Sequence, residues 1–175
     1  MAPNALRVSL VASLALALVP LACMASETDR SQEDATVARI GDGDSFELEG
    51  GDRVRLLQID APELGEGECY SREALGELRR LLPSRQMIEL EADPGLDDID
   101  RFGRLLRYVH VAGSNVNVEL VRRGAATPWF FEGARGRYAG DLLAAAASAK
   151  AERRGMWGAC RVSWRPESPV VTRPG

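Results

Sequence analysis

The sequence predicts an α+β domain, because segments that alternate apolar and polar residues come first along the chain and segments with helical periodicity come later. Breakers separate these segments: glycine-rich turns lie between the early strands, and a proline or a glycine follows each expected helix. The length of 175 residues, with 45% hydrophobic and 27% charged residues, suits one globular domain with processed or flexible ends.

Alternation and turn signals define the first part of the domain. Five strands are expected, over residues 36–40, 45–48, 53–59, 87–91 and 105–111. A helix is expected between the third and fourth strands, where Ser71 can act as the N-cap, leucines repeat on one face and Pro83 ends the pattern. Five strands with a helix after the third match an OB-fold barrel.

Two further helices are expected in the second part of the chain. Residues 116–123 form a short helix closed by Gly124, and residues 138–153 form a longer, alanine-rich helix closed by Gly155. The domain is therefore expected over residues 35–160. Residues 161–175 contain three prolines and few large apolar side chains, which predicts a disordered tail.

The amino terminus has the pattern of an export signal over residues 1–25, followed by a polar linker over residues 26–34. One positive charge precedes a nearly continuous apolar run that is short for a membrane span, and small residues follow it. Cleavage after Ala25 would release an exported, soluble protein. The alternative is a lipid anchor at Cys23, because Leu21-Ala22-Cys23 resembles a lipoprotein signal, although Pro20 departs from that pattern.

With Cys23 removed or lipidated, Cys69 and Cys160 remain as an even pair in an oxidising compartment, which predicts a disulfide. Such a bridge closes a loop of about 90 residues and is worth roughly 4 to 5 kcal/mol in the chain-entropy account. Two buried free thiols are the alternative. Two cysteines and a single histidine, His110, give no ligand set with structural-zinc spacing. His110 is an expected strand residue.

One short segment carries most of the chemistry. Arg55 lies on the third expected strand, and Asp60 and Glu63 follow where Pro62 prevents a regular ladder from continuing. Two carboxylates and a guanidinium group are thus expected at a strand end. By itself this segment also fits an ordinary turn in which the aspartate caps the next amides.

Two other segments extend this pattern: Asp42-Gly43-Asp44-Ser45 upstream and Asp100-Arg101-Phe102-Gly103-Arg104 downstream. Together the three motifs, in this order, resemble the staphylococcal-nuclease-like (thermonuclease) family. The resemblance runs from about residue 36 to residue 157. It implies the same OB-fold barrel and a calcium-dependent nuclease activity.

Phosphodiester cleavage needs an activated water and a charge clamp, and a hard cation with oxygen ligands serves such a site. Oxygen-only ligands predict calcium or magnesium, and the resemblance implies Ca²⁺; Asp44 and Asp60 are the candidate carboxylate ligands. The resemblance implies that the backbone carbonyl of Ala61 completes the protein's share, at a position where the family commonly has threonine. Asp42 is expected just outside these ligands, where it holds a metal-bound water or the turn.

The resemblance also implies catalytic roles for three charged residues. Glu63 orients or deprotonates the attacking water as the general base. Arg55 and Arg104 can grip phosphate oxygens in fork geometry and stabilise the charge of the transition state. Glu66 and Glu68 are nearby candidates for the same role, and only the motif selects Glu63 as the general base.

Aromatic side chains supply candidate stacking surfaces for bases. Phe102 stands where many relatives have tyrosine, and stacking or packing is retained there. Phe130 is the second candidate, within the run Trp129-Phe130-Phe131. Three consecutive aromatics cannot all point one way, so at least one is expected in the core.

The formal net charge of −4 predicts weak non-specific affinity for long duplex DNA. The arginines nevertheless concentrate around the expected site. We expect a monomer without an obligate protein partner that hydrolyses DNA and RNA with little base preference and prefers single strands. The resemblance implies that cleavage leaves 3′-phosphate ends. The alternative is a catalytically inactive OB-type module that binds nucleic acid or a protein; an exported scaffold that does neither is a third.

Overall fold

The computed structural model describes residues 32–175, so the expected export signal, the Cys23 anchor and most of the linker lie outside the described residues. The linker ends earlier than expected, because residues 32–34 already belong to the first strand. The strands are β1 Gln32–Ile40, β2 Ser45–Leu48, β3 Arg53–Leu56, β4 Ile59–Asp60, β5 Met87–Glu91, β6 Leu105–Val111, β7 Ser114–Asn115, β8 Thr127–Pro128, β9 Cys160–Arg165 and β10 Ser168–Pro174. The helices are α1 Ser71–Leu81, α2 Val116–Arg122, the 3₁₀ turn η1 Phe131–Gly133, α3 Ala139–Ala151 and the one-turn α4 Met156–Ala159.

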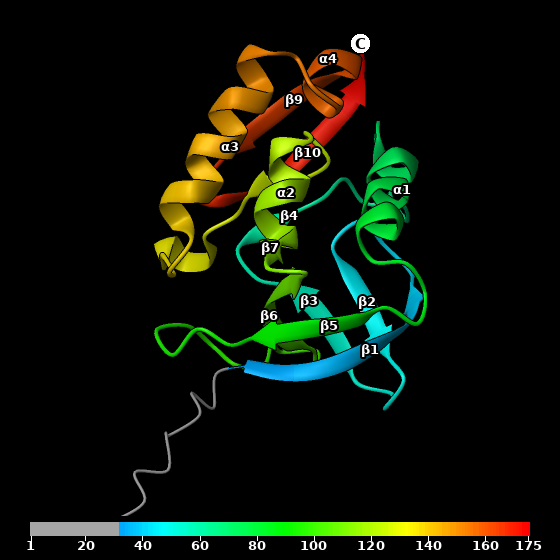
Figure 1. Cartoon of the computed structure of the whole chain (residues 1–175). Helices are drawn as coiled ribbons and strands as arrows, with labels where there is room; N and C mark the ends of the chain where they lie inside the picture. The colour runs from blue at the N-terminus through cyan, green and yellow to red at the C-terminus, as the bar shows by residue number, and fades with distance from the viewer. Residues whose placement is uncertain (1–31) are drawn as a thin grey trace, which may run out of the picture.

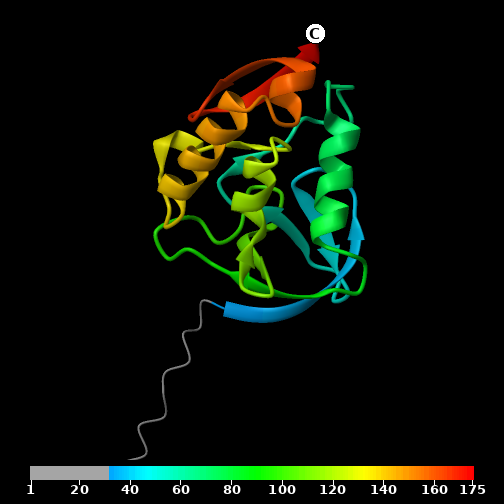
Figure 2. The same cartoon turned by 45° about the horizontal axis from the view of Figure 1, so that its top comes forward.

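Strands β1, β2, β3, β5 and β6 form a closed mixed barrel. Their order is β3-β2-β1-β5-β6, and a parallel pairing of β3 with β6 joins the two ends of the sheet. The predicted OB-fold barrel with three main helices is therefore confirmed. The five barrel strands lie toward one end of the molecule, and α3, α4 and the β9–β10 hairpin lie toward the other (Figures 1 and 2). No helix among residues 32–175 is both long enough and apolar enough to span a bilayer.

The barrel closes on an apolar core because alternate residues of its strands point inward. Val37, Phe46, Val54, Leu90 and Val109 are each at most 3% exposed. His110 lies on β6, as expected.

The third expected strand is interrupted, which changes the position of everything that follows it. Strand β3 ends at Leu56, and Gln58 has a left-handed backbone with φ of 59°. The Gln58 side chain holds this turn: its Nε2 donates to the Ala134 carbonyl at 2.7 Å, and its Oε1 accepts from the Gly136 amide at 2.8 Å. The chain resumes as β4, which pairs with β8 instead of continuing in the barrel.

Helix α1 does not use the expected N-cap. Its N-cap residue is Tyr70, which has a left-handed backbone and makes no capping side-chain bond. The Ser71 hydroxyl donates instead to the Glu68 carbonyl at 2.8 Å. Helix α2 is capped by Asn115, whose side chain accepts from the Val118 amide at 3.0 Å. The helices thus form where periodicity predicts them, but the prediction of Ser71 as the N-cap of α1 was wrong.

The carboxyl-terminal segment corrects a prediction. Residues 161–175 were expected to be disordered, but they lie in the antiparallel hairpin of β9 and β10. Strand β9 exposes every second residue and turns the others inward, and Val170 and Thr172 of β10 are at most 4% exposed. The predicted disulfide is present between Cys69 and Cys160, with Cα atoms 6.1 Å apart. It joins the start of β9 to the loop before α1.

Candidate active site

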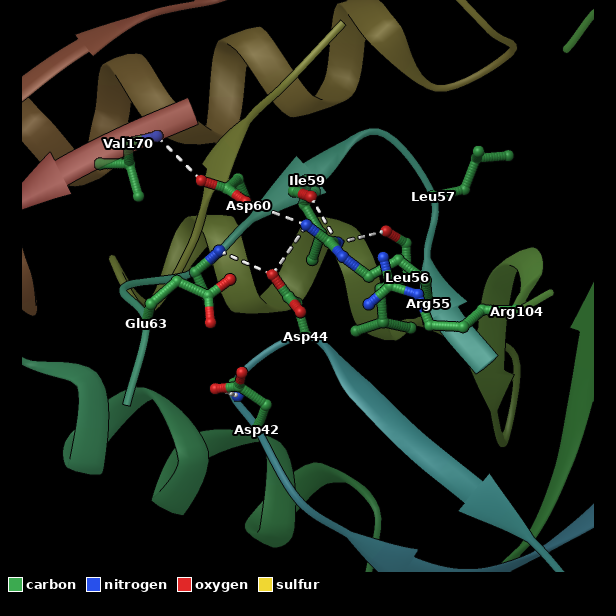
Figure 3. Close-up of polar contacts among 12 residues, drawn as sticks. Asp42, Asp44, Arg55, Leu56, Leu57, Ile59, Asp60, Glu63, Arg104 and Val170 are labelled. Atoms are coloured by element: carbon green, nitrogen blue, oxygen red, sulfur yellow. Dashed lines mark hydrogen bonds and ion pairs between the residues drawn. The ribbon is translucent and has the colours of Figure 1, made fainter. Parts of the chain in front are cut away.

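Arg55 lies at the centre of a buried ion cluster (Figure 3). Its Nη2 lies 2.9 Å from Asp44 Oδ2 and 2.9 Å from Asp60 Oδ1. Its Nη1 donates to the carbonyl oxygens of Leu56, at 2.9 Å, and Ile59, at 2.7 Å. None of the three charged side chains is more than 7% exposed. Both Nη groups are therefore engaged within the cluster, so Arg55 does not present the open fork that was expected for phosphate, and its Nε–H makes no hydrogen bond to any residue that the structure describes.

The turn before β2 and the break after β3 bring these groups together. Ser45 pairs with Arg55 across β2 and β3, which places the preceding Asp44 beside the guanidinium group. The Ala61 amide then donates to Asp44 Oδ2 at 3.0 Å. Gly43 allows this approach, because a Cβ there would lie only 2.8 Å from the Ala61 Cβ.

The acidic groups of the cluster outnumber its buried arginine. Burial raises the pKa of Asp44, and the neighbouring Arg55 only partly opposes this. Burial likewise raises the pKa of Asp60 to about 6, against the attraction of Arg55 and together with repulsion from Asp44. Two buried carboxyl groups thus share one buried arginine, and a cation bound beside them would favour their charged forms.

Glu63 extends toward Asp42 and Asp44 (Figure 3). Partial burial, a hydrogen bond with Asp42 and repulsion from Asp42, Asp44 and Asp60 raise the pKa of Glu63 to about 8. Asp42 itself accepts from the Gly43 amide at 2.7 Å, so it also holds the turn. A carboxyl group with a pKa near neutrality has the proton affinity that a general base requires.

Arg104 points toward Arg55 and Asp44 from the opposite side of the site to Glu63 (Figure 3). Its Nε donates to Asp100 Oδ2 at 2.7 Å, and its amide donates to Asp100 Oδ1 at 3.0 Å. Its Nη groups make no hydrogen bond to any residue that the structure describes. Arg104 is thus oriented through Nε and keeps its outer fork available for an anion.

The residues fit a hard divalent cation. Asp44 and Asp60 supply two carboxylates, and the Ala61 carbonyl accepts no hydrogen bond from the described part of the chain. Among residues 32–175, no three acidic, histidine or cysteine side chains are grouped so that they could hold a metal ion by themselves. Two carboxylates and one carbonyl therefore leave several ligand positions for water and substrate oxygens, as such cations commonly require.

The two expected stacking residues have different environments. Phe102 is 57% exposed. The distance to its ring centre is 4.7 Å from the Cζ atom of Arg101 and 5.5 Å from that of Arg104. Phe130 is fully buried, so the expectation that it stacks on bases is wrong. Phe131, the next residue, is 61% exposed. The run of three aromatics gave no signal for which ring faces outward.

Sequence reasoning missed three contacts of the acidic cluster. The Arg55 Cζ lies 5.8 Å from the centre of the Trp129 ring. The Val170 amide donates to Asp60 Oδ2 at 2.8 Å, although the two residues are 110 positions apart. Glu68 Oε2 accepts from the Glu63 amide at 2.8 Å. Trp129 and Glu68 had been considered for other roles, whereas Val170 lies in the segment that was expected to be disordered.

Comparison with known proteins agrees with the geometry of the site. The staphylococcal nuclease homologue family matches residues 53–159. The SPbeta prophage-derived endonuclease YokF of Bacillus subtilis is 32% identical over 71% of this chain and 44% of its own length. Endonuclease YncB of the same organism is 30% identical over 75% of this chain and 65% of its own length. The thermonuclease of Staphylococcus intermedius is 33% identical over 61% of this chain and 66% of its own length.

The fold and the site define an OB-fold protein with an acid-and-arginine centre suited to phosphate esters. The chain belongs to the staphylococcal nuclease family. It spans less than half the length of YokF and about two thirds of the other two relatives, and β10 lies beyond the matched residues.

Proposed function

We propose that this chain is a calcium-dependent nuclease that hydrolyses phosphodiester bonds in DNA and RNA with little base preference. The observation that carries the proposal is the cluster in which Arg55 holds Asp44 and Asp60 beside Glu63. Family membership supports the same activity. The names of the three relatives support it as well, since two are endonucleases and one is a thermonuclease.

The cation is assigned to Asp44, Asp60 and the Ala61 carbonyl. When bound, calcium would supply positive charge to the nonbridging phosphate oxygens and hold them in place. Oxygen ligands alone suit calcium or magnesium, and membership of the staphylococcal nuclease family favours calcium.

The chain's own side chains divide the remaining work. Glu63 takes a proton from the attacking water, the water oxygen bonds to phosphorus, and the bond from phosphorus to the 5′ oxygen breaks. The 5′ oxygen leaves as a hydroxyl group after protonation, and the phosphate remains on the 3′ end. Arg104 grips the phosphate with its open fork, whereas Arg55 contributes one Nε–H and mainly orders the two aspartates.

Substrate class follows from charge and access. The net charge of −4 gives little non-specific attraction to a long duplex, so contact depends on local arginines such as Arg104 and Arg101. The exposed Phe102 ring beside them offers a surface for an unpaired base. Single strands and frayed ends are therefore the favoured substrates.

We further propose that the protein acts outside the cytoplasm, because of the export pattern over residues 1–25 and the Cys69–Cys160 disulfide. We also propose that it is a monomer. A lipid anchor at Cys23 is the other form of export that the sequence allows. Mass spectrometry of the mature amino terminus distinguishes a free start at Ser26 from a lipidated Cys23.

Digestion of single-stranded DNA and of RNA with calcium or with chelator tests the activity. We expect cleavage with calcium only. The products should have 5′-hydroxyl ends, which a polynucleotide kinase can label, and 3′-phosphate ends. Retention of nucleic acid without cleavage, unaffected by chelator, would establish the binding module in place of the nuclease.

A further inference from the structure

The β9–β10 hairpin packs against the acidic side of the site. The Val170 amide of β10 donates to Asp60 Oδ2 at 2.8 Å (Figure 3), and the Thr172 amide donates to Glu68 Oε1 at 3.0 Å. The Thr172 hydroxyl donates to the Cys69 carbonyl at 2.7 Å. Alternate residues of one strand thus contact both the cluster aspartate and the loop that carries the glutamate.

Asp60 is fixed at both of its oxygens. Oδ1 faces Arg55 and Oδ2 accepts the Val170 amide, so the plane of the carboxylate cannot rotate without breaking a charge-assisted bond. Each oxygen keeps a second lone pair. The strand therefore determines the direction in which Asp60 presents these lone pairs.

Glu68 connects the same strand to Glu63. Its Oε2 accepts from the Glu63 amide at 2.8 Å, while its Oε1 accepts from Thr172. The Glu68 amide in turn donates to the Glu63 carbonyl at 3.2 Å. Both backbone groups of Glu63 are thus held by one residue, and that residue is held by β10.

The hairpin and the loop behave as one unit because they are also joined covalently. Cys69, next to Glu68, forms the disulfide with Cys160, the first residue of β9. At its other end the hairpin is held by the Pro166 carbonyl, which accepts from the Phe130 amide at 2.6 Å. The strand that contacts the site is therefore anchored on both sides.

We propose that β10 is a positioning element of the active site, with the Val170 amide orienting Asp60 and with Glu68 as a positioning residue for Glu63. The proposal rests on the nuclease function proposed above. It extends the site to a strand outside the matched residues 53–159 and to a glutamate whose two carboxylate oxygens each accept a backbone amide.

Glu68→Gln tests the link to Glu63, with Glu66→Gln as the matched control. Both variants remove one charge from the same loop, and Glu66 is exposed. An amide has one acceptor oxygen, so Glu68→Gln can satisfy only one of the two backbone amides that the carboxylate holds. We expect kcat on single-stranded DNA to fall about tenfold in Glu68→Gln, with KM and melting temperature close to those of Glu66→Gln. Equal kcat values in the two variants would overturn this part of the proposal.

Val170→Pro tests the link to Asp60, because proline removes the donating amide. Val170→Ala keeps that amide and shows the effect of the lost side chain. Calorimetric titration with calcium is the measurement, since it does not depend on cleavage. We expect calcium affinity to be about fivefold or more lower in Val170→Pro than in Val170→Ala, and equal affinities in two folded proteins would refute the role of β10.

The two proposals fail in different ways. If the parent binds calcium but cuts no nucleic acid, the nuclease function is wrong, and the calorimetric comparison still decides whether β10 orients Asp60. If the parent cuts DNA and the substitutions at Glu68 and Val170 match their controls, the nuclease function stands and the positioning role is wrong.

Discussion

Arg55→Lys is the substitution whose effect follows most directly from the structure. Arg55 donates from Nη1 to two backbone carbonyls and from Nη2 to Asp60, and Nη2 also forms an ion pair with Asp44. Lysine has three donors on one nitrogen and lacks the planar fork. It keeps the charge but cannot meet four acceptors that surround a guanidinium group, so at least one buried acceptor loses its partner.

The size of the effect depends on burial. Asp44 and Asp60 are 3% and 5% exposed, so solvent cannot replace a lost partner. Breaking a buried ion pair costs about 3 to 5 kcal/mol, and the retained charge of lysine favours the lower value of about 3 kcal/mol. For a domain of this size, that loss lowers the melting temperature by roughly 10 °C. Displaced carboxylates should also lower kcat about 100-fold or more.

Arg53→Lys is the matched control, because Arg53 lies on the same strand but makes one exposed bond, from Nη2 to the Phe102 carbonyl at 2.8 Å. It should change the free energy of unfolding by no more than about 0.5 kcal/mol. Urea unfolding and hydrolysis of single-stranded DNA measure the two effects. If Arg55→Lys matches Arg53→Lys in both assays, Arg55 does not organise the acidic cluster.

Three further predictions follow from other parts of the structure. Arg104→Lys should lower kcat/KM about tenfold or more with little change in melting temperature, since its Nη groups make no hydrogen bond to any residue that the structure describes; an unchanged kcat/KM would show that a positive charge without the fork is sufficient there. Gly124→Ala should destabilise the fold by about 2 kcal/mol more than Gly113→Ala in urea unfolding, because both glycines have positive φ but only at Gly124 would a Cβ collide with backbone; equal losses would contradict this. Reduction of the disulfide should lower the free energy of unfolding by roughly 4 kcal/mol, and unchanged urea midpoints with and without reductant would show that the bridge does not stabilise the fold.

Local patterns predicted the barrel because alternation and turn residues agree along most of it. The chain turns after Leu56 for a reason that no pattern contains: Gln58 adopts a left-handed backbone that glutamine rarely adopts, and distant carbonyl and amide groups hold its side chain. This turn brings Asp60 back to Arg55. Sequence reasoning thus identified the charged residues but not the way in which they meet.

The carboxyl-terminal hairpin was missed because its prolines were given too much weight. Pro169 and Pro174 lie within β10, where an edge strand tolerates proline, and the inward alternation of Val170 and Thr172 was the available signal. Phe130 was misplaced for a different reason. Which of three consecutive rings enters the core depends on backbone direction, and sequence alone does not give that direction.

Single-turnover cleavage of single-stranded DNA by the parent and by Glu63→Gln, measured across a calcium titration, tests the central claim most directly. The claim is that Asp44 and Asp60 hold the cation while Glu63, whose pKa is raised to about 8, handles the proton. The account predicts that the two proteins show similar calcium dependence and that the variant cleaves at least about 100-fold more slowly. Equal rates at saturating calcium, or cleavage by the parent in chelator, would contradict it.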